Sequence, residues 1–224
     1  MSITLTENID KPALFSDFSN EDYVQLDGLM HKEISFGDYI YFEANQHPNI
    51  YFIKTGLVRL GYLDAQGNKI VKDILRPGDF FGQVSLQKEN LNGEFAQAVK
   101  SGVSICYFTL DKFNSLLANH PKLAMKYTRM SGHRIRRFES RLENLLRNDV
   151  KARLKIFLNQ LLTDVKDSAR MIGAEVRIPN YLTHEEVAQL IGTSRQTVTT
   201  LLSTFKEENI CSFSRKELRF YNQG

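Results

Sequence analysis

The residues best suited to specific chemistry lie in one short stretch near the carboxyl end of the chain. Short hydrogen-bonding side chains recur there every three or four residues, at Gln196, Thr199, Thr200 and Ser203. Apolar side chains recur with a similar spacing, about two residues out of step, at Val198, Leu201, Leu202 and Phe205. Because two residues correspond to roughly 200° on a helix, the pattern predicts a helix that packs its apolar side on a core and turns an uncharged polar side outward.

A polar, uncharged helix face of this kind is suited to reading base edges in the major groove of DNA. Glutamine pairs with adenine, a threonine methyl packs on the thymine methyl, and Arg195, at the edge of the face, would pair with guanine. The alternative is an ordinary helical hairpin with a polar exterior.

A second helix is predicted just before this one. Thr183 and Glu186 have the spacing of a capping box, which marks a helix start. Gly192 stands where a tight turn needs a positive φ, and Thr193 or Ser194 is suited to cap the next helix. The two helices and the turn predict a helix-turn-helix.

Two strands, 210–213 and 218–221, are predicted after the helix-turn-helix, around a tip that contains Arg215 and Lys216. Basic side chains at such a tip would contact phosphates without reading sequence, and Lys206 and Arg219 would assist them. A helix-turn-helix followed by a hairpin is a winged helix. The candidate DNA-binding residues are Thr183, Ser194, Arg195, Gln196, Thr197, Thr199, Thr200, Ser203, Arg215 and Lys216.

Residues 119–147 predict one long helix that opens near Pro121, a position that suits a first turn. Its apolar residues follow heptad spacing, at Ile135, Phe138, Leu142 and Leu145. Arginines flank this narrow stripe, so pairing with a second copy of the helix is expected; a helix lying on its own domain's sheet is the alternative. Beyond it, Val150–Leu162 predicts an amphipathic helix and residues 164–179 a polar connection.

Residues 32–110 predict antiparallel strands. The strand-like runs are Tyr39–Phe42, Ile50–Ile53, Leu57–Leu63 and Ile70–Leu75, with a turn signal at Gly56 between the second and third. Many short strands favour a sandwich, barrel or roll. We therefore predict an α+β chain: a jelly-roll-like antiparallel β-roll in residues 1–118, a dimerisation helix in 119–148 and a winged helix-turn-helix in 149–224.

Charge is unevenly distributed along the chain. The net charge is only +3, but residues 1–118 carry 10 basic and 15 acidic side chains, whereas residues 119–148 carry 8 basic and 2 acidic ones. This asymmetry favours a polyanionic partner. A solvated helix face would also account for it.

Several classes of protein are disfavoured by composition. The chain start lacks the features of a signal peptide, no run of about 18 apolar residues occurs, and Cys106 and Cys211 are too few for a disulfide framework or a cysteine-bound cluster. We expect a cytoplasmic protein with no metal or other cofactor. An enzyme with a metal-binding roll would need clustered histidines, and the strand region has only His31 and His47.

The order of these motifs resembles the Crp/Fnr family of bacterial transcription regulators. The stretches that carry the resemblance are Tyr51–Arg59, Arg76–Gly82 and Gly192–Val198. The resemblance implies a cyclic-nucleotide-binding-type β-roll and a homodimer on a two-fold-related operator, with half-sites about one helical turn apart. It also implies RNA polymerase as a partner.

The chain departs from the nucleotide-binding members of that family. Gln83 stands where they have a glutamate for the ribose hydroxyl. They carry an arginine for the cyclic phosphate, but residues 92–97 include Glu94, and no arginine occurs between Arg76 and Arg129. A buried phosphate without a cation is unfavourable. An effector other than cyclic AMP or cyclic GMP is therefore expected, if there is one.

Phe138 and Glu139 replace the Thr-Ser step that receives adenine in the cyclic AMP receptor. The candidate effector pocket comprises Phe81, Gly82, Gln83, Val84, Ser85, Phe95, Ala96 and Phe138. A second hypothesis is a ligand-binding signalling module that regulates a partner protein. This second hypothesis does not explain the polar face of the helix or the basic residues of the hairpin.

Overall fold

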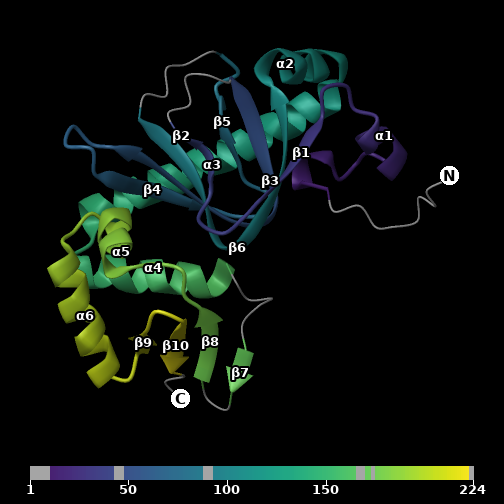
Figure 1. The fold of residues 1–224 in the computed structure, drawn as a ribbon. Helices are drawn as coiled ribbons and strands as arrows, with labels where there is room; N and C mark the ends of the chain where they lie inside the picture. Colours follow the sequence, from purple (N-terminus) through teal and green to yellow (C-terminus); the bar gives the residue numbers. More distant parts are fainter. Residues whose placement is uncertain (1–10, 43–47, 88–92, 165–169, 173–174, 222–224) are drawn as a thin grey trace. The chain divides into compact units, whose positions relative to one another are not determined.

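The computed structural model describes residues 11–42, 48–87, 93–164, 170–172 and 175–221. The chain divides into two compact units, residues 1–134 and 135–224. The boundary falls inside the long helix α3, Pro121–Arg147 (Figure 1). The presence of this helix confirms the long helix that was predicted over residues 119–147.

An antiparallel sheet forms the first unit, with strand order β1-β6-β3-β4; β2 also pairs with β6, and β5 with β3. The strands are β1 Met30–Ile34, β2 Tyr39–Phe42, β3 Asn49–Leu63, β4 Lys69–Leu75, β5 Phe80–Gly82 and β6 Glu94–Thr109. The sheet curls on itself, as the predicted roll requires (Figure 1).

The pairing of β3 with β6 runs from Asn49 opposite Thr109 to Tyr62 opposite Glu94. The predicted turn at Gly56 is wrong, because the pairing continues on both sides of it and only shifts register between Ile53 and Leu57. Gly56 has φ +84°, and a Cβ there would lie 2.7 Å from the carbonyl oxygen of Gly102. The glycine therefore serves an irregularity within one strand rather than a chain reversal.

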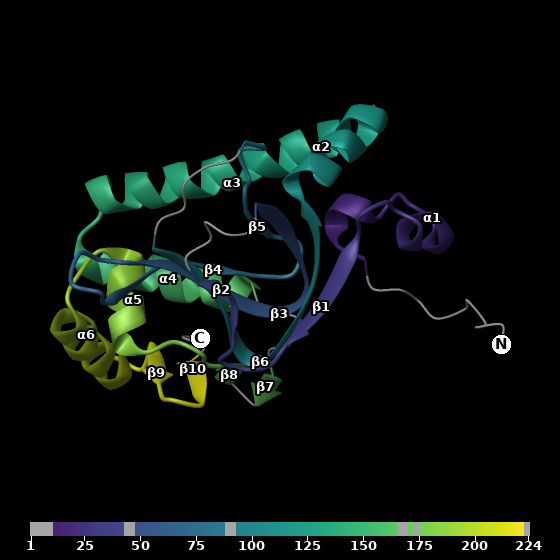
Figure 2. The ribbon, with the colours of Figure 1, turned by 45° about the horizontal axis from the view of Figure 1, so that its top comes forward.

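Two hydrophobic clusters fill the first unit. One packs aromatic rings of the sheet, including Phe52 and Phe108, against Phe113 and Tyr127 of the helices. The other lies within the sheet and is built from aliphatic side chains with Tyr51 and Phe81. Figure 2 shows α2 and the start of α3 beside these strands.

Besides the start of α3, the first unit contains the helical segments η1 Ala13–Phe15, α1 Asn20–Val24 and α2 Leu110–Asn119. Sequence reasoning missed α2, although Thr109 caps it and Leu110, Phe113, Leu116 and Leu117 are buried along it. Its apolar spacing follows directly on β6, so the strand pattern obscured the start of the helix.

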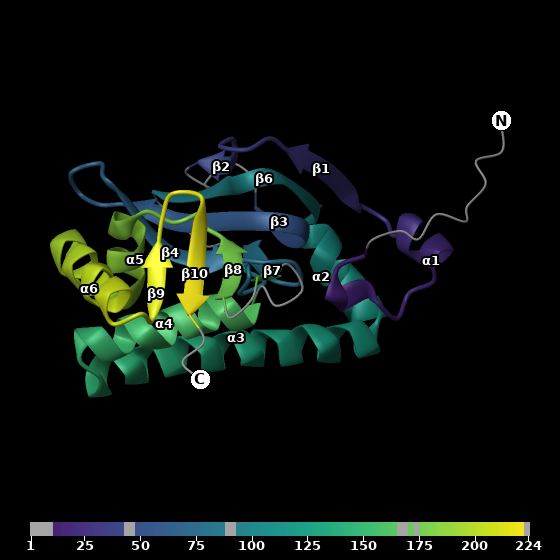
Figure 3. The same ribbon diagram turned by 90° about the horizontal axis from the view of Figure 1, so that it is seen from below.

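The second unit consists of helices and one small antiparallel sheet. The helices after α3 are α4 Val150–Asp164, α5 His184–Ile191 and α6 Arg195–Glu207. The strands are β7 Arg170–Ile172, β8 Glu175–Pro179, β9 Cys211–Phe213 and β10 Glu217–Tyr221, in the order β7-β8-β10-β9 (Figure 3).

The predicted polar connection over 164–179 is wrong for the part of it that the structure describes. β7 and β8 pair with each other, and β8 pairs with β10 so that buried Ile178 lies opposite buried Leu218. Within β8, polar Glu175 and Arg177 alternate with apolar Val176 and Ile178, which suits a strand with one solvated face. The predicted wing is therefore part of a four-stranded sheet.

Candidate nucleic-acid interface and effector site

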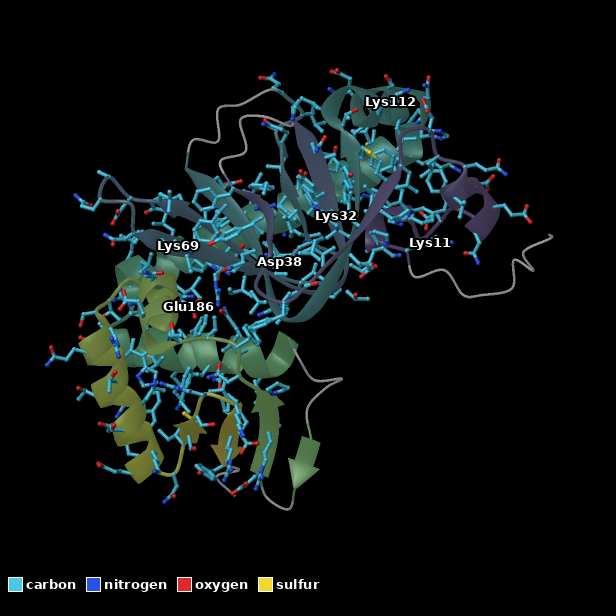
Figure 4. All side chains as sticks on the ribbon, viewed as in Figure 1. Lys11, Lys32, Asp38, Lys69, Lys112 and Glu186 are labelled. Carbon is cyan, nitrogen blue, oxygen red and sulfur yellow. The ribbon has the colours of Figure 1, made fainter. Side chains whose placement is uncertain are left out.

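The helix-turn-helix begins with a complete capping box. The backbone N–H of Glu186 donates to Thr183 Oγ1 (3.2 Å), and the N–H of Thr183 donates to Glu186 Oε2 (2.7 Å). α5 ends at Gly192, whose φ is +68°. The predicted start and turn of the motif are both confirmed (Glu186 is labelled in Figure 4).

α6 is capped by Ser194, whose Oγ accepts from the N–H of Thr197 (3.1 Å). Val198, Leu202 and Phe205 are buried, and Leu201 is half-buried. The predicted apolar side of this helix therefore does face a core. Because that side is held by packing, the opposite side of α6 is displayed at a defined orientation within the unit.

The opposite side of α6 is exposed at every predicted reading position: Arg195, Gln196, Thr199, Thr200 and Ser203. Thr197, also a candidate, is half-buried, and its hydroxyl lies 2.8 Å from that of Ser194. The structure thus brings these predicted residues together on one helix, while Thr183 lies exposed at the start of the preceding one.

The wing tip exposes Arg215 and Lys216. The turn that presents them is closed by Ser214, whose Oγ accepts from the N–H of Glu217 (3.2 Å). Arg219 differs from the expectation, since its Nε donates to Glu217 Oε1 at 2.6 Å and its charge is paired within its own strand. Of the basic residues predicted at the wing, Arg215 and Lys216 are exposed, whereas Arg219 is paired with Glu217.

Arg153 on α4 is a residue that sequence reasoning missed. Its guanidinium donates to the carbonyl oxygen of Leu145 on α3 and to that of Gly192 in the turn, both at 3.2 Å. A Cβ at Gly192 would lie 2.7 Å from Leu145 Cδ2. Arg153 therefore holds the end of α3 to the turn that precedes α6. Its role follows from proximity in the fold and has no signal in the local sequence.

His184 is the second residue that was missed. Its Nδ1 lies 2.8 Å from Thr199 Oγ1 on α6, and its ring packs edge-on against Phe213 of β9, with ring centroids 5.0 Å apart. Partial burial lowers the pKa of His184, and the nearby charge of Arg195 lowers it further. The imidazole therefore favours its neutral form in the folded state.

Most of the predicted effector residues are packed into the first unit. Phe81, Phe95 and Ala96 are fully buried, and Phe81 stacks on Tyr51 with ring centroids 5.0 Å apart. Gln83 is only 3 % exposed, and its backbone N–H donates to the carbonyl oxygen of Asn49 (3.0 Å).

The remaining effector candidates lie nearer the surface. Gly82 and Val84 are half-buried and Ser85 is exposed. The carbonyl oxygen of Val84 accepts a hydrogen bond from the Tyr127 hydroxyl (2.6 Å), which ties this segment to α3. The last candidate, Phe138, belongs to the second unit, so its grouping with the others stays a prediction.

No arginine lies within residues 92–97, but cations from other strands contact the described residues 93–97. Lys72 of β4 forms an ion pair with the carboxylate of Glu94, and Arg59 of β3 donates to Gln97 Oε1 (3.1 Å). Lys72 precedes Glu94 by 22 residues, Arg59 precedes Gln97 by 38 residues, and strand pairing brings each pair together. Because of this separation along the chain, neither contact could be predicted from the sequence.

Glu94 is a buried carboxylate whose oxygens are both engaged. The Tyr41 hydroxyl donates to Oε1 at 2.6 Å, and Lys72 binds Oε2. Burial raises the pKa of Tyr41 well above its usual value, and the negative charge of Glu94 adds to the rise. The Tyr41 hydroxyl therefore stays protonated and donates its hydrogen bond to Glu94.

The predicted seam residues of α3 are all exposed: Ile135 by 58 %, Phe138 by 43 %, Leu142 by 56 % and Leu145 by 42 %. Leu146, which was not predicted, is 78 % exposed beside them. Arg141 lies over the Phe138 ring, 5.8 Å from its centroid. Such a row of large apolar side chains on one helix is unusual for a surface that faces only water.

Neither a metal-binding cluster nor a membrane-spanning helix occurs among the described residues. Across the described ranges, no group of three or more His, Cys, Asp and Glu side chains is placed to hold a metal ion. Burial raises the pKa values of Cys106 and Cys211 to about 11, so both are thiols at neutral pH. No helix within those ranges is long and apolar enough to span a membrane. His47 lies outside them.

Comparisons with protein families match both units. A model of the cyclic nucleotide-binding domain matches residues 31–120, and a model of the Crp-like helix-turn-helix domain matches residues 152–222. The global nitrogen regulator of Synechocystis sp. is 29 % identical over 184 residues, which are 82 % of this chain and 80 % of that protein.

A further relative is the CRP-like cAMP-activated global transcriptional regulator of Mycobacterium tuberculosis. It is 28 % identical over 169 residues, covering 75 % of this chain and 74 % of the relative. Among solved structures, a transcriptional regulator of the CRP/FNR family from Thermus thermophilus matches with a TM-score of 0.69 at 23 % identity, covering 86 % of this chain and 94 % of that one. This last match concerns the fold alone.

Proposed function

Because the chain belongs to the Crp/Fnr family of DNA-binding transcription regulators, we propose that it acts as a homodimer on a two-fold-related operator. We further propose that its effector is neither cyclic AMP nor cyclic GMP. The division into a β-roll sensor, residues 1–118, a dimerisation helix, 119–148, and a winged helix, 149–224, is part of the proposal.

The observation that carries DNA reading is the exposed, uncharged polar face of α6 in the same unit as the exposed basic wing tip. Arg195, Gln196 and the hydroxyl residues of α6 suit base edges, and Arg215 and Lys216 suit phosphates. A helix in the major groove with a wing on the backbone uses both surfaces at once.

Random-operator selection tests this proposal. A two-fold-related sequence should emerge, with half-sites about one helical turn apart, 34–36 Å or a multiple of it. Selection of no sequence at all would contradict operator reading and favour a signalling module for a partner protein.

The exposed apolar row on α3 supports dimer formation. Ile135, Phe138, Leu142 and Leu145 follow heptad spacing and expose large apolar surfaces, and a second copy would remove them from water. Leu142→Glu should convert the dimer to a monomer, measured by sedimentation. Ser140→Glu adds the same charge at the heptad position farthest from the seam and should leave the mass unchanged. A dimeric Leu142→Glu variant would refute the seam.

The environment of Glu94 supports the exclusion of cyclic nucleotides. Lys72 is already bound to the Glu94 carboxylate, so a phosphate placed there would meet a negative charge whose counterion is taken. Gln83 offers an amide in place of a carboxylate for a ribose hydroxyl.

Titration calorimetry with cyclic AMP and with cyclic GMP tests the exclusion. Neither nucleotide should release heat at micromolar concentrations, and micromolar binding of either would overturn this part of the proposal. RNA polymerase is the partner that family membership suggests; transcription in vitro from a promoter carrying the selected operator should change when the protein is added.

A further inference from the structure

The hydroxyl groups on the reading face of α6 are turned back onto the helix. Thr199 Oγ1 donates to the carbonyl oxygen of Arg195 (2.9 Å), and Thr200 Oγ1 donates to that of Gln196 (3.1 Å). Ser203 Oγ donates to the carbonyl oxygen of Thr199 (3.1 Å). A hydroxyl has one proton to donate, so these three side chains have used their donors inside the helix.

This geometry changes what the face offers to a base. Thr199 and Thr200 are exposed, and with each hydroxyl proton given to the backbone they can no longer donate to a base. What each side chain still offers a partner is its γ-methyl and any acceptor lone pair of Oγ1 that is not already used. In the major groove only thymine presents a methyl of its own. Hydrogen-bond donors on the face are left to Arg195 and Gln196.

Thr199 is held more firmly than Thr200, because His184 contacts it from α5. Since the Thr199 proton goes to the carbonyl oxygen of Arg195, His184 Nδ1 must carry a proton and donate to Thr199 Oγ1 (2.8 Å). The imidazole is itself held edge-on against Phe213 of the wing strand β9. The orientation of the Thr199 side chain is thus fixed by contacts that involve the first turn of α5, the helix α6 and the wing strand β9.

We infer that α6 recognises thymine through the methyl groups of Thr199 and Thr200, and that His184 is a positioning residue that keeps the Thr199 methyl toward the bases. The inference rests on the proposed operator binding and adds to it the class of base that is read. Each selected half-site should contain thymines opposite these two side chains.

Deoxyuracil substitution in the selected operator tests the methyl contact, because it removes one methyl and keeps every hydrogen bond of the base. Replacing the thymine opposite Thr200 should weaken binding about fourfold. This factor corresponds to the free energy of about 0.8 kcal/mol that burial of one methyl group contributes. Thr200→Val, which keeps the methyl and loses the hydroxyl, should show the same loss. Thr200→Ser, which loses the methyl, should bind both operators equally.

Two outcomes would overturn the methyl contact. Uracil could be neutral at every thymine of the operator, or Thr200→Val could abolish the discrimination while Thr200→Ser retains it, which would assign reading to the hydroxyl. Both leave operator selection intact and are therefore distinct from a failure of DNA binding itself.

The role of His184 is tested at the Thr199 position. His184→Phe keeps a ring against Phe213 and removes the donor; it should reduce thymine–uracil discrimination opposite Thr199 to within about 1.5-fold and leave that opposite Thr200 unchanged. His184→Asn keeps a donor near the Nδ1 position and should restore discrimination. A merely structural residue would change both positions together. Unchanged discrimination at both positions in His184→Phe would overturn the assignment.

Discussion

The charged and amide side chains of the β-roll and those of α6 are arranged in opposite ways. In the roll, Glu94 is buried and bound by Tyr41 and Lys72, and Gln97 is bound by Arg59. On α6, Arg195 and Gln196 extend from an exposed face. A group whose partners come from its own chain contributes to stability, whereas an exposed group is available to an outside partner. Glu94 and Gln97 thus contribute to the stability of the roll, whereas Arg195 and Gln196 remain accessible to an outside partner.

Phe205→Ala tests how far the exposed face depends on the core beneath it. Phe205 is completely buried on the inner side of α6, so the change should lower the free energy of unfolding of the second unit by about 3–5 kcal/mol. Circular dichroism during denaturation measures it. Phe205→Leu, which leaves a smaller cavity, should cost less. A loss below about 1 kcal/mol for the alanine variant would mean that α6 is not anchored by this side chain.

Glu94→Ala tests the internal pairing of the roll. It leaves the Tyr41 hydroxyl and Lys72 without their acceptor and should destabilise the first unit by about 1–3 kcal/mol. Glu94→Gln should cost less, because an amide oxygen still accepts from Tyr41. Tyrosine fluorescence follows the unfolding, since the chain has no tryptophan. If both variants were as stable as the parent protein, the contacts of Glu94 would not contribute to the stability of the first unit.

Arg195→Ala and Gln196→Ala test recognition by the exposed face. Each should cost about 1–3 kcal/mol on the selected operator and relax base preference at one position per half-site. The free energy of unfolding should stay within about 0.5 kcal/mol, because both side chains are exposed. Fluorescence anisotropy on the operator and its single-base variants provides the measurement.

Lys216→Ala should have the smallest effect. The wing tip contacts phosphates in the proposed complex, so binding to all sequences should weaken similarly and the slope of log K against log salt should fall by about one. Titrations at several salt concentrations measure the slope. If Lys216→Ala and Gln196→Ala had the same sequence dependence, the division between reading face and wing would be wrong.

How well the sequence predicted each region depended on the range of the interactions involved. The long helix α3 and the capping box at Thr183 depend on spacing over a few residues, and both were predicted correctly. β8 was missed, because a short polar strand is stabilised by its neighbour β10, more than 30 residues later in the chain. Gly56 was misread as a turn, because a glycine with positive φ serves a bulge equally well.

The sequence by itself determined which side of α6 is apolar and where the helix-turn-helix begins and turns, since these features depend on spacing within one or two helical turns. Only the tertiary structure decided that Lys72 meets Glu94, that Arg59 meets Gln97 and that His184 meets Thr199. The physical reason is that strand register and helix crossing create these contacts, between residues that lie 15 to 38 positions apart.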